Sequence, residues 1–144
     1  MVIVDDSDLI QQRLVSLLKP MAGVTVAGRA RNMVEGETVI RDQAPDLVIL
    51  DVNLGGENGL NLLKPIKEGP DPPMVLVFTN YPYPAFRTYS RDLGAEHFLT
   101  KSGDFHRIPG IIKDFAAEGT PGAADPPRQT SSRKKRRGPP EEEG

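Results

Sequence analysis

The sequence predicts a doubly wound α/β fold, in which a five-stranded parallel sheet is covered by helices on both faces. Two observations support this prediction. Short apolar runs of strand length, rich in β-branched residues, recur along the first hundred residues, and segments with the apolar spacing of helices separate them. Strands that are apolar throughout are typical of parallel sheets buried on both faces, where helical crossovers join successive strands.

Five strands and five helical segments are predicted. The strands are Val2–Val4, Val24–Ala27, Leu47–Leu50, Met74–Phe78 and His97–Thr100. The helical segments are residues 10–18, 36–44, 59–66, 85–93 and 105–115. Ser7 or Asp6 can cap the first of these helices. Pro84 stands where the first turn of the fourth helix tolerates a proline.

Composition limits the class of protein. The chain has 144 residues, of which 38% are hydrophobic, so one domain with one core is expected. It has no cysteine, which excludes disulfides and thiolate metal sites. No apolar stretch approaches the roughly 20 residues of a membrane span. The N-terminus also lacks the layout of a signal peptide. We therefore expect a cytoplasmic protein without a membrane span.

The last residues differ in composition from the rest. Residues 119–144 are rich in Gly, Pro, Ser and charge and hold no aliphatic side chain larger than alanine, so a disordered tail is predicted. This tail has six basic and four acidic residues, a charge of +2, and the total of -2 leaves about -4 for residues 1–118. Its basic run, residues 133–137, could contact nucleic acid or an acidic membrane, or fold back on the acidic body. We expect instead that the tail is solvated and makes none of these contacts. The tail is too short for a folded DNA-binding domain.

Polar residues stand at four predicted strand ends. Asp5 and Asp6 follow the first strand, and Asp51 ends the third. Thr79 ends the fourth strand and Lys101 follows the fifth. Right-handed crossovers bring the carboxyl ends of parallel strands to one edge of the sheet, where ligands bind. These side chains are therefore predicted to meet.

Such a group of carboxylates requires a positive charge. Two like charges about 4 Å apart repel by roughly 4 kcal/mol at an effective dielectric constant near 20. Oxygen ligands favour a hard ion, and Mg²⁺ commonly binds one or two carboxylates together with a phosphoryl group. Lys101 adds a fixed charge and Thr79 a hydroxyl. Asp51 is therefore predicted to be the nucleophile of a phosphoryl transfer.

The motifs carry a resemblance to a known family. They are VDDS at residues 4–7, LVILDVNLGGENGL at 47–60, VFTN at 77–80 and FLTKS at 98–102. In their order and approximate spacing they resemble the receiver domain of bacterial two-component response regulators, here of the stand-alone type. The resemblance covers about residues 1–118, which are identified as the receiver domain. It implies the flavodoxin-like strand order 2-1-3-4-5.

The resemblance also implies roles for individual residues. Asp51 would accept a phosphoryl group from the phosphohistidine of a sensor kinase or a histidine phosphotransfer protein. Asp6 and Asp51 would bind Mg²⁺, or Mn²⁺, directly. Asp5 would help position the metal through water, and Asn53 would contribute its backbone carbonyl.

The remaining implied roles concern signalling. Lys101 would pair with the phosphoryl oxygens, Thr79 would move toward them, and Phe98 would be a switch aromatic that turns inward. Downstream proteins would bind the face made by the fourth helix, fifth strand and fifth helix. Such a protein hydrolyses its own aspartyl phosphate slowly and is not a metabolic enzyme. Ser102 replaces a proline that is cis in many members, and a cis bond before a non-proline residue costs roughly 3 kcal/mol, so the resemblance does not settle the isomer of the bond after Lys101.

Three alternatives stay open. A hydrolase of the haloacid dehalogenase type also uses an aspartyl nucleophile and Mg²⁺, but its nucleophile follows the first strand in a D-x-D pair, whereas Asn53 breaks that pair here. A flavin carrier on the same sheet would need a Gly/Ser/Thr-rich loop after the first strand, where this chain has the acidic DDSD. A scaffold that is not phosphorylated is the third, although no acceptor residue has been lost.

Overall fold

The computed structural model describes residues 1–119. Contacts divide the chain into a first unit, Met1–Arg107, and a second unit that begins at Ile108. Within the described residues the second unit is a single helix, α5 (Ile108–Gly119). The predicted tail begins at the last residue of this helix and otherwise lies outside the described residues.

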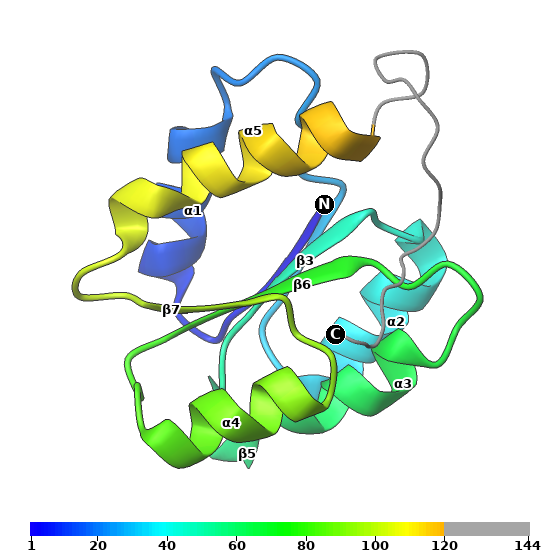
Figure 1. Ribbon diagram of the computed structural model, residues 1–144, viewed down its shortest axis with the longest axis vertical. Coiled ribbons are helices and arrows are strands. Elements are labelled where there is room, and N and C mark those ends of the chain that lie inside the picture. Colours follow the sequence, from blue (N-terminus) through cyan, green and yellow to red (C-terminus); the bar gives the residue numbers. More distant parts are fainter. Residues whose placement is uncertain (120–144) are drawn as a thin grey trace. The chain divides into compact units, whose positions relative to one another are not determined.

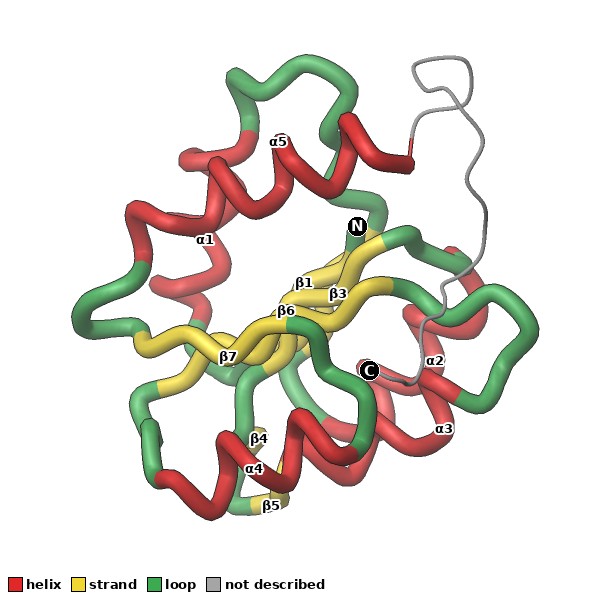
Figure 2. Tube along the Cα trace, viewed as in Figure 1, coloured by secondary structure: helices red, strands yellow, loops and turns green. Residues whose placement is uncertain are grey.

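The first unit contains a five-stranded sheet whose strands all run parallel. Its order is β2-β1-β3-β6-β7, which confirms the order 2-1-3-4-5 predicted for the five main strands (Figure 2). The strands are β1 (Val2–Val4), β2 (Gly28–Ala30), β3 (Leu47–Leu50), β6 (Met74–Thr79) and β7 (His97–Thr100). The long apolar runs form the three central strands, as expected for strands buried on both faces.

Helices of the first unit lie on both sides of this sheet. They are α1 (Asp8–Leu18), α2 (Met33–Gln43), α3 (Leu63–Lys67) and α4 (Pro84–Asp92). Figure 1 shows α1 on the opposite side of the sheet from α2, α3 and α4. Because side chains alternate along a strand, Val4, Leu50 and Val77 enter the core cluster that includes Ile40 of α2 and Leu63 of α3. The residues next to them in the strands face the α1 side.

The helix ends follow from local chemistry. Ser7 caps α1, since its hydroxyl accepts a hydrogen bond from the Ile10 N–H at 3.2 Å. Asn32 caps α2 by accepting from the Glu35 N–H at 2.9 Å. Pro84 is the first residue of α4, as its position in the sequence predicts. Of the two caps considered for α1, the structure therefore selects Ser7.

The second strand was predicted at the wrong residues. It is Gly28–Ala30 instead of the apolar run Val24–Ala27. A Cβ atom on Gly28 would lie 2.5 Å from Val39 Cγ1, so α2 packs directly against the backbone of this strand. The strand residue beneath α2 is therefore a glycine, which a search for apolar runs does not select.

Other differences are short elements around the third strand and the last helix. Asn53–Leu54 (β4) and Glu57–Asn58 (β5) form an antiparallel hairpin that was not predicted. Its turn is Gly55-Gly56, with φ of 63° and 92°, which glycine adopts without strain. The third and fifth helical segments begin as 3₁₀ turns, η1 (Gly59–Leu62) and η2 (Phe105–Arg107). A 3₁₀ turn has three residues per turn, so the apolar spacing at the start of these two segments differs from that of an α-helix.

Two expected absences concern only residues 1–119. None of the helices described there is long and apolar enough to cross a membrane. No peptide bond within these residues is cis, so the bond between Lys101 and Ser102, whose isomer the sequence left open, is trans.

Candidate functional site

Backbone hydrogen bonds carry the strand ladders one residue past the strand ends and so fix the polar residues there. The Asp5 N–H donates to the Ala30 carbonyl and the Asp51 N–H to the Val4 carbonyl, both at 3.0 Å. The Lys101 N–H donates to the Thr79 carbonyl at 2.9 Å. Asp5, Asp51 and Lys101 therefore leave the sheet at the same edge, held as firmly as the strands themselves.

Three carboxylates meet at this edge. One oxygen from each of Asp5, Asp6 and Asp51 lies within 4.8 Å of the others. Asp5 and Asp51 are buried, being 2% and 4% exposed, and Asp6 is exposed. The predicted convergence of these acids is confirmed. We call these three residues the acid cluster.

Lys101 is the cation that neutralises part of the acid cluster. Its Nζ lies 2.7 Å from Asp5 Oδ2 and 2.9 Å from Asp51 Oδ2, and its side chain is only 6% exposed. Burial by itself lowers the pKa of Lys101, but its contacts with Asp5 and Asp51 outweigh this effect and raise that pKa above its usual value. Lys101 is therefore held in its charged form.

One ammonium does not balance three carboxylates. Burial is the largest cause that raises the pKa of Asp5, and the charge of Asp51 adds to it, while hydrogen bonds from Lys101 and Ser7 oppose it. Lys101 forms its two ion pairs with Asp5 and Asp51, and not with Asp6. Asp6 Oδ2 accepts a hydrogen bond from the Gly55 N–H at 3.2 Å. The acid cluster thus has the negative charge, the oxygen ligand atoms and the solvent access that suit a hard divalent cation.

Asp51 keeps one oxygen loosely bound. Lys101 contacts Oδ2, whereas from residues 1–119 Oδ1 accepts only a long hydrogen bond of 3.4 Å, from the Asn53 N–H. A carboxylate in this state has an oxygen free for nucleophilic attack, with a cation beside it to stabilise added negative charge.

Thr79 lies at the same edge, but its hydroxyl has another contact. Thr79 is fully buried, and its Oγ1 accepts a hydrogen bond from the Tyr81 N–H at 3.1 Å. Among the described residues this hydroxyl forms no hydrogen bond with Asp51. Thr79 is thus placed near the site by its strand and held by the loop that follows.

Phe98 lies half-buried on β7 and packs against the core cluster. Arg87 of α4 covers its ring, with the guanidinium carbon 4.6 Å from the ring centroid. Arg87 Nη1 also donates to the Phe98 carbonyl at 3.3 Å. This contact joins α4 to β7.

Two further contacts lie around the acceptor. The Tyr81 hydroxyl oxygen accepts a hydrogen bond from Asn53 Nδ2 at 3.4 Å, across 28 positions of the chain. A Cβ at Gly59 would overlap the backbone oxygen of Asp51, so η1 packs directly against the residue that follows β3. The first contact starts from the hairpin Asn53–Asn58, which the sequence did not predict.

Comparisons with known proteins agree with this geometry. The model of a family described as the response regulator receiver domain matches residues 1–113. The sensory transduction protein LytT of Bacillus subtilis (strain 168) is 35% identical over 113 residues, which are 78% of this chain and 46% of that protein. LytR of Staphylococcus haemolyticus (strain JCSC1435) is 32% identical over 110 residues, 76% of this chain and 42% of that protein. The chain spans about half the length of these curated relatives.

Solved structures show the same fold. The signal receiver domain of the putative response regulator NarL from Mycobacterium tuberculosis aligns with a TM-score of 0.73 and 26% sequence identity. The alignment covers 83% of this chain and 95% of that domain. The match therefore extends over nearly the whole of a receiver domain.

Proposed function

Because this chain belongs to the family of response regulator receiver domains, we propose that it is a phosphorylation-dependent switch whose phosphoryl acceptor is Asp51. The donor is the phosphohistidine of a sensor histidine kinase or of a histidine phosphotransfer protein. The observation that carries this proposal is the position of Asp51, whose Oδ2 lies 2.9 Å from Lys101 Nζ within the acid cluster. The alternatives of a dehalogenase-type hydrolase and a flavin carrier are not favoured, because the family match covers residues 1–113.

The transfer follows from the charges at the site. A carboxylate oxygen of Asp51 attacks phosphorus, the bond between phosphorus and the histidine nitrogen breaks, and the imidazole leaves with the electron pair. Lys101 Nζ, already in contact with Asp51, pairs with the phosphoryl oxygens. Since the ammonium is buried and fixed, it stabilises the transferred charge without reorganisation.

Mg²⁺ is the cation that this site suits, and Mn²⁺ fits the same oxygen donors. Asp6 and Asp51 would bind it directly, together with the backbone carbonyl of Asn53, and Asp5 would act through water. Asp6 supports this assignment, because it is exposed and lies outside both Lys101 contacts. When bound, the ion would neutralise charge on the transferring phosphoryl group.

Signalling would then arise from a change in populations. For Thr79 to reach the phosphoryl group, its hydroxyl must give up the hydrogen bond from the Tyr81 N–H. Phe98 is the proposed switch aromatic, and its present position is held by Arg87. Both changes alter the surface of α4 and β7, which we propose as part of the face that a downstream protein recognises.

Two further features belong to this proposal. The chain would hydrolyse its own aspartyl phosphate slowly and would not turn over metabolic substrates. It would act in the cytoplasm, as the sequence predicts, where a phosphohistidine donor can reach Asp51.

Phosphorylation by a small donor tests the acceptor without a partner kinase. The full chain is incubated with acetyl phosphate and Mg²⁺, and its intact mass is measured. We expect the parent to gain the mass of one phosphoryl group and Asp51→Asn to gain none. The matched control is Asp46→Asn, an exposed acid just before the same strand, which should behave like the parent. A gain that survives in Asp51→Asn would exclude this acceptor.

A further inference from the structure

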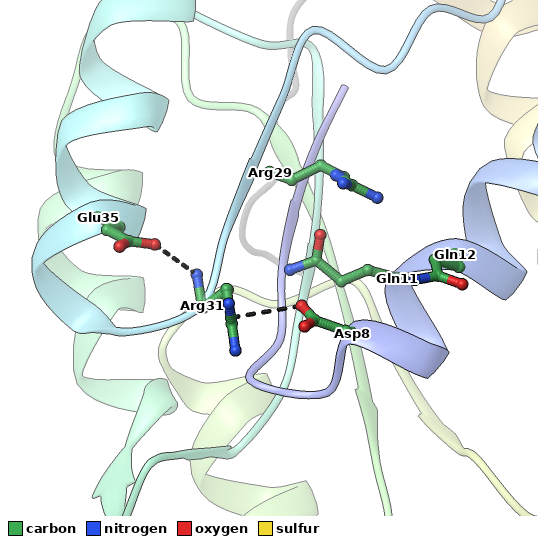
Figure 3. A pocket seen from close by; sticks show the side chains of 6 residues that line it. All are labelled: Asp8, Gln11, Gln12, Arg29, Arg31 and Glu35. Carbon is green, nitrogen blue, oxygen red and sulfur yellow. Dashed lines mark hydrogen bonds and ion pairs between the residues drawn. The ribbon is translucent and has the colours of Figure 1, made fainter.

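A second polar site lies beside the edge strand of the sheet. Six residues from the start of α1, from β2 and its following residue, and from the first turn of α2 line a pocket of about 380 Å³ (Figure 3). They are Asp8, Gln11, Gln12, Arg29, Arg31 and Glu35. We call it the Arg29 pocket. None of its residues belongs to the acid cluster.

Arg29 occupies an unusual position in the sheet. It pairs with Ile3, which in turn pairs with Ile49, so its neighbours in this row are buried and apolar. Gly28 and Ala30 face α2, where Gly28 approaches Val39. Arg29 therefore points to the α1 side, because side chains alternate along a strand. Arg29 is exposed, and within residues 1–119 its guanidinium forms no ion pair, so it is solvated and open to an anionic ligand.

Gln11 supplies an acceptor next to this cation. The residue is 2% exposed, and its Nε2 donates to the carbonyls of Asp5 at 2.8 Å and Ala30 at 2.7 Å. Both N–H groups are thus used, which fixes the orientation of the amide. Its Oε1 receives no hydrogen bond from the described residues, and Figure 3 shows this oxygen on the side of the Gln11 amide where Arg29 lies. A buried acceptor without a donor is unfavourable.

The acids of the pocket are already engaged at its rim. Arg31 Nε lies 3.4 Å from Asp8 Oδ1, and the Arg31 N–H donates to Glu35 Oε1 at 3.0 Å. Figure 3 shows both contacts on the Arg31 side of the pocket. Neither contact involves Arg29. The pocket therefore offers one free cation and one free, buried acceptor.

We propose that the Arg29 pocket binds a small carboxylate that also carries a hydroxyl or ammonium donor. The carboxylate pairs with the planar guanidinium of Arg29, which suits two parallel hydrogen bonds. The donor group bonds to Gln11 Oε1 and satisfies it. A fully ionised phosphate does not fit, because it has no hydrogen to give and the amide oxygen would repel it. The volume suffices for a ligand of this size.

Four small compounds of similar size test separately whether binding needs a carboxylate, for Arg29, and a hydrogen-bond donor, for Gln11 Oε1. L-lactate and L-alanine carry both a carboxylate and a donor, propionate lacks the donor, and propane-1,2-diol lacks the charge. Each is titrated into the ¹⁵N-labelled full chain without Mg²⁺ or a phosphoryl donor, so the result is independent of the function proposed for Asp51. We expect saturable shifts of the Gln11 side-chain amide with lactate or alanine, and binding at least about tenfold weaker for the other two.

Variants then locate the binding. Arg29→Gln should weaken the binding of the better ligand at least about tenfold. Arg41→Gln is the matched control, an exposed arginine of α2 whose contact is with the adjacent Asp42, and it should leave binding unchanged. Far-UV circular dichroism checks that both variants fold. We choose Arg29→Gln because a substitution at Gln11 would also remove its hydrogen bonds to the Asp5 and Ala30 carbonyls and so disturb the fold. Equal binding of lactate, alanine and propionate, or unchanged binding in Arg29→Gln, overturns the proposal.

Discussion

Lys101 places its ammonium nitrogen 2.9 Å from a carboxylate oxygen of Asp51, although 50 positions separate the two residues in the chain. Their side chains are only 6% and 4% exposed, so solvent screens this contact little. The same ammonium contacts Asp5 at 2.7 Å. Lys101 therefore holds two strand ends together, and its charge matters for stability as well as for chemistry.

Removing this charge should destabilise the metal-free protein. Lys101→Met leaves Asp5 and Asp51 buried without their cation, and breaking a buried pair in this way costs about 3 kcal/mol or more. Urea unfolding in the presence of a chelator measures the loss. Lys64→Met, at an exposed lysine of α3, is the control and should change stability by less than about 0.5 kcal/mol. Equal losses in the two variants would contradict this account.

Mg²⁺ should stabilise the folded chain through the acid cluster. A ligand that binds only the folded state adds about 2.7 kcal/mol at a hundred times its Kd. Asp6→Asn should remove most of this gain, because Asp6 is the carboxylate that Lys101 leaves free. Asp8→Asn, two residues along and outside the cluster, should keep it. Thermal unfolding with and without Mg²⁺ compares the three proteins, and a gain retained by Asp6→Asn would exclude Asp6 as a ligand.

The pKa values of two carboxyl groups, Asp104 and Asp5, should depart from the usual 3.8 in opposite directions. The backbone hydrogen bond from Thr100 lowers the pKa of Asp104, so its contribution to stability is present above pH 3.8 and is lost as pH falls through its folded pKa. Burial raises the pKa of Asp5, so its ionisation removes stability as pH rises from 3.8 through its folded pKa. Carboxyl ¹³C NMR of the metal-free chain should show Asp104 titrating first from low pH. The reverse order would contradict both assignments.

The sequence predicted the site better than it predicted the sheet's edge. Asp5, Asp51 and Lys101 were found because the carboxyl ends of parallel strands must meet, whatever the loops do. The predicted position of β2 was wrong because the strand is Gly-Arg-Ala, with a glycine packed under α2 and no apolar run. The contact between Asn53 and Tyr81 was missed because it joins two loops whose shapes no periodic pattern encodes. Local periodicity therefore located the ends of the apolar strands that carry Asp5 and Asp51, and it failed at the edge strand β2, which is not apolar.

Gly59 should be essential for the position of Asp51. A Cβ at residue 59 would lie 2.0 Å from the Asp51 backbone oxygen, so the strand end or η1 must move in Gly59→Ala. We expect a loss of at least about 2 kcal/mol in stability, together with weaker acceptance of phosphoryl groups. Gly69→Ala is the matched control, since no atom lies within 4 Å of its Cβ position. It should be neutral or slightly stabilising in urea unfolding. Equal stability of the two variants would show that the backbone yields easily here.

Tyr81 should slow the loss of the phosphoryl group from Asp51. Its hydroxyl accepts a hydrogen bond from the Asn53 side chain, and the Asn53 N–H contacts Asp51 Oδ1, so Tyr81 restrains the loop that borders the acceptor. Tyr81→Phe, which loses this hydrogen bond, should shorten the lifetime of the phosphorylated chain several-fold, and Tyr81→Ala should shorten it at least as much. Intact-mass measurements after removal of acetyl phosphate give the lifetimes. Tyr89→Ala, at an exposed aromatic of α4, should match the parent, and the same lifetime in Tyr81→Ala would rule out this restraint.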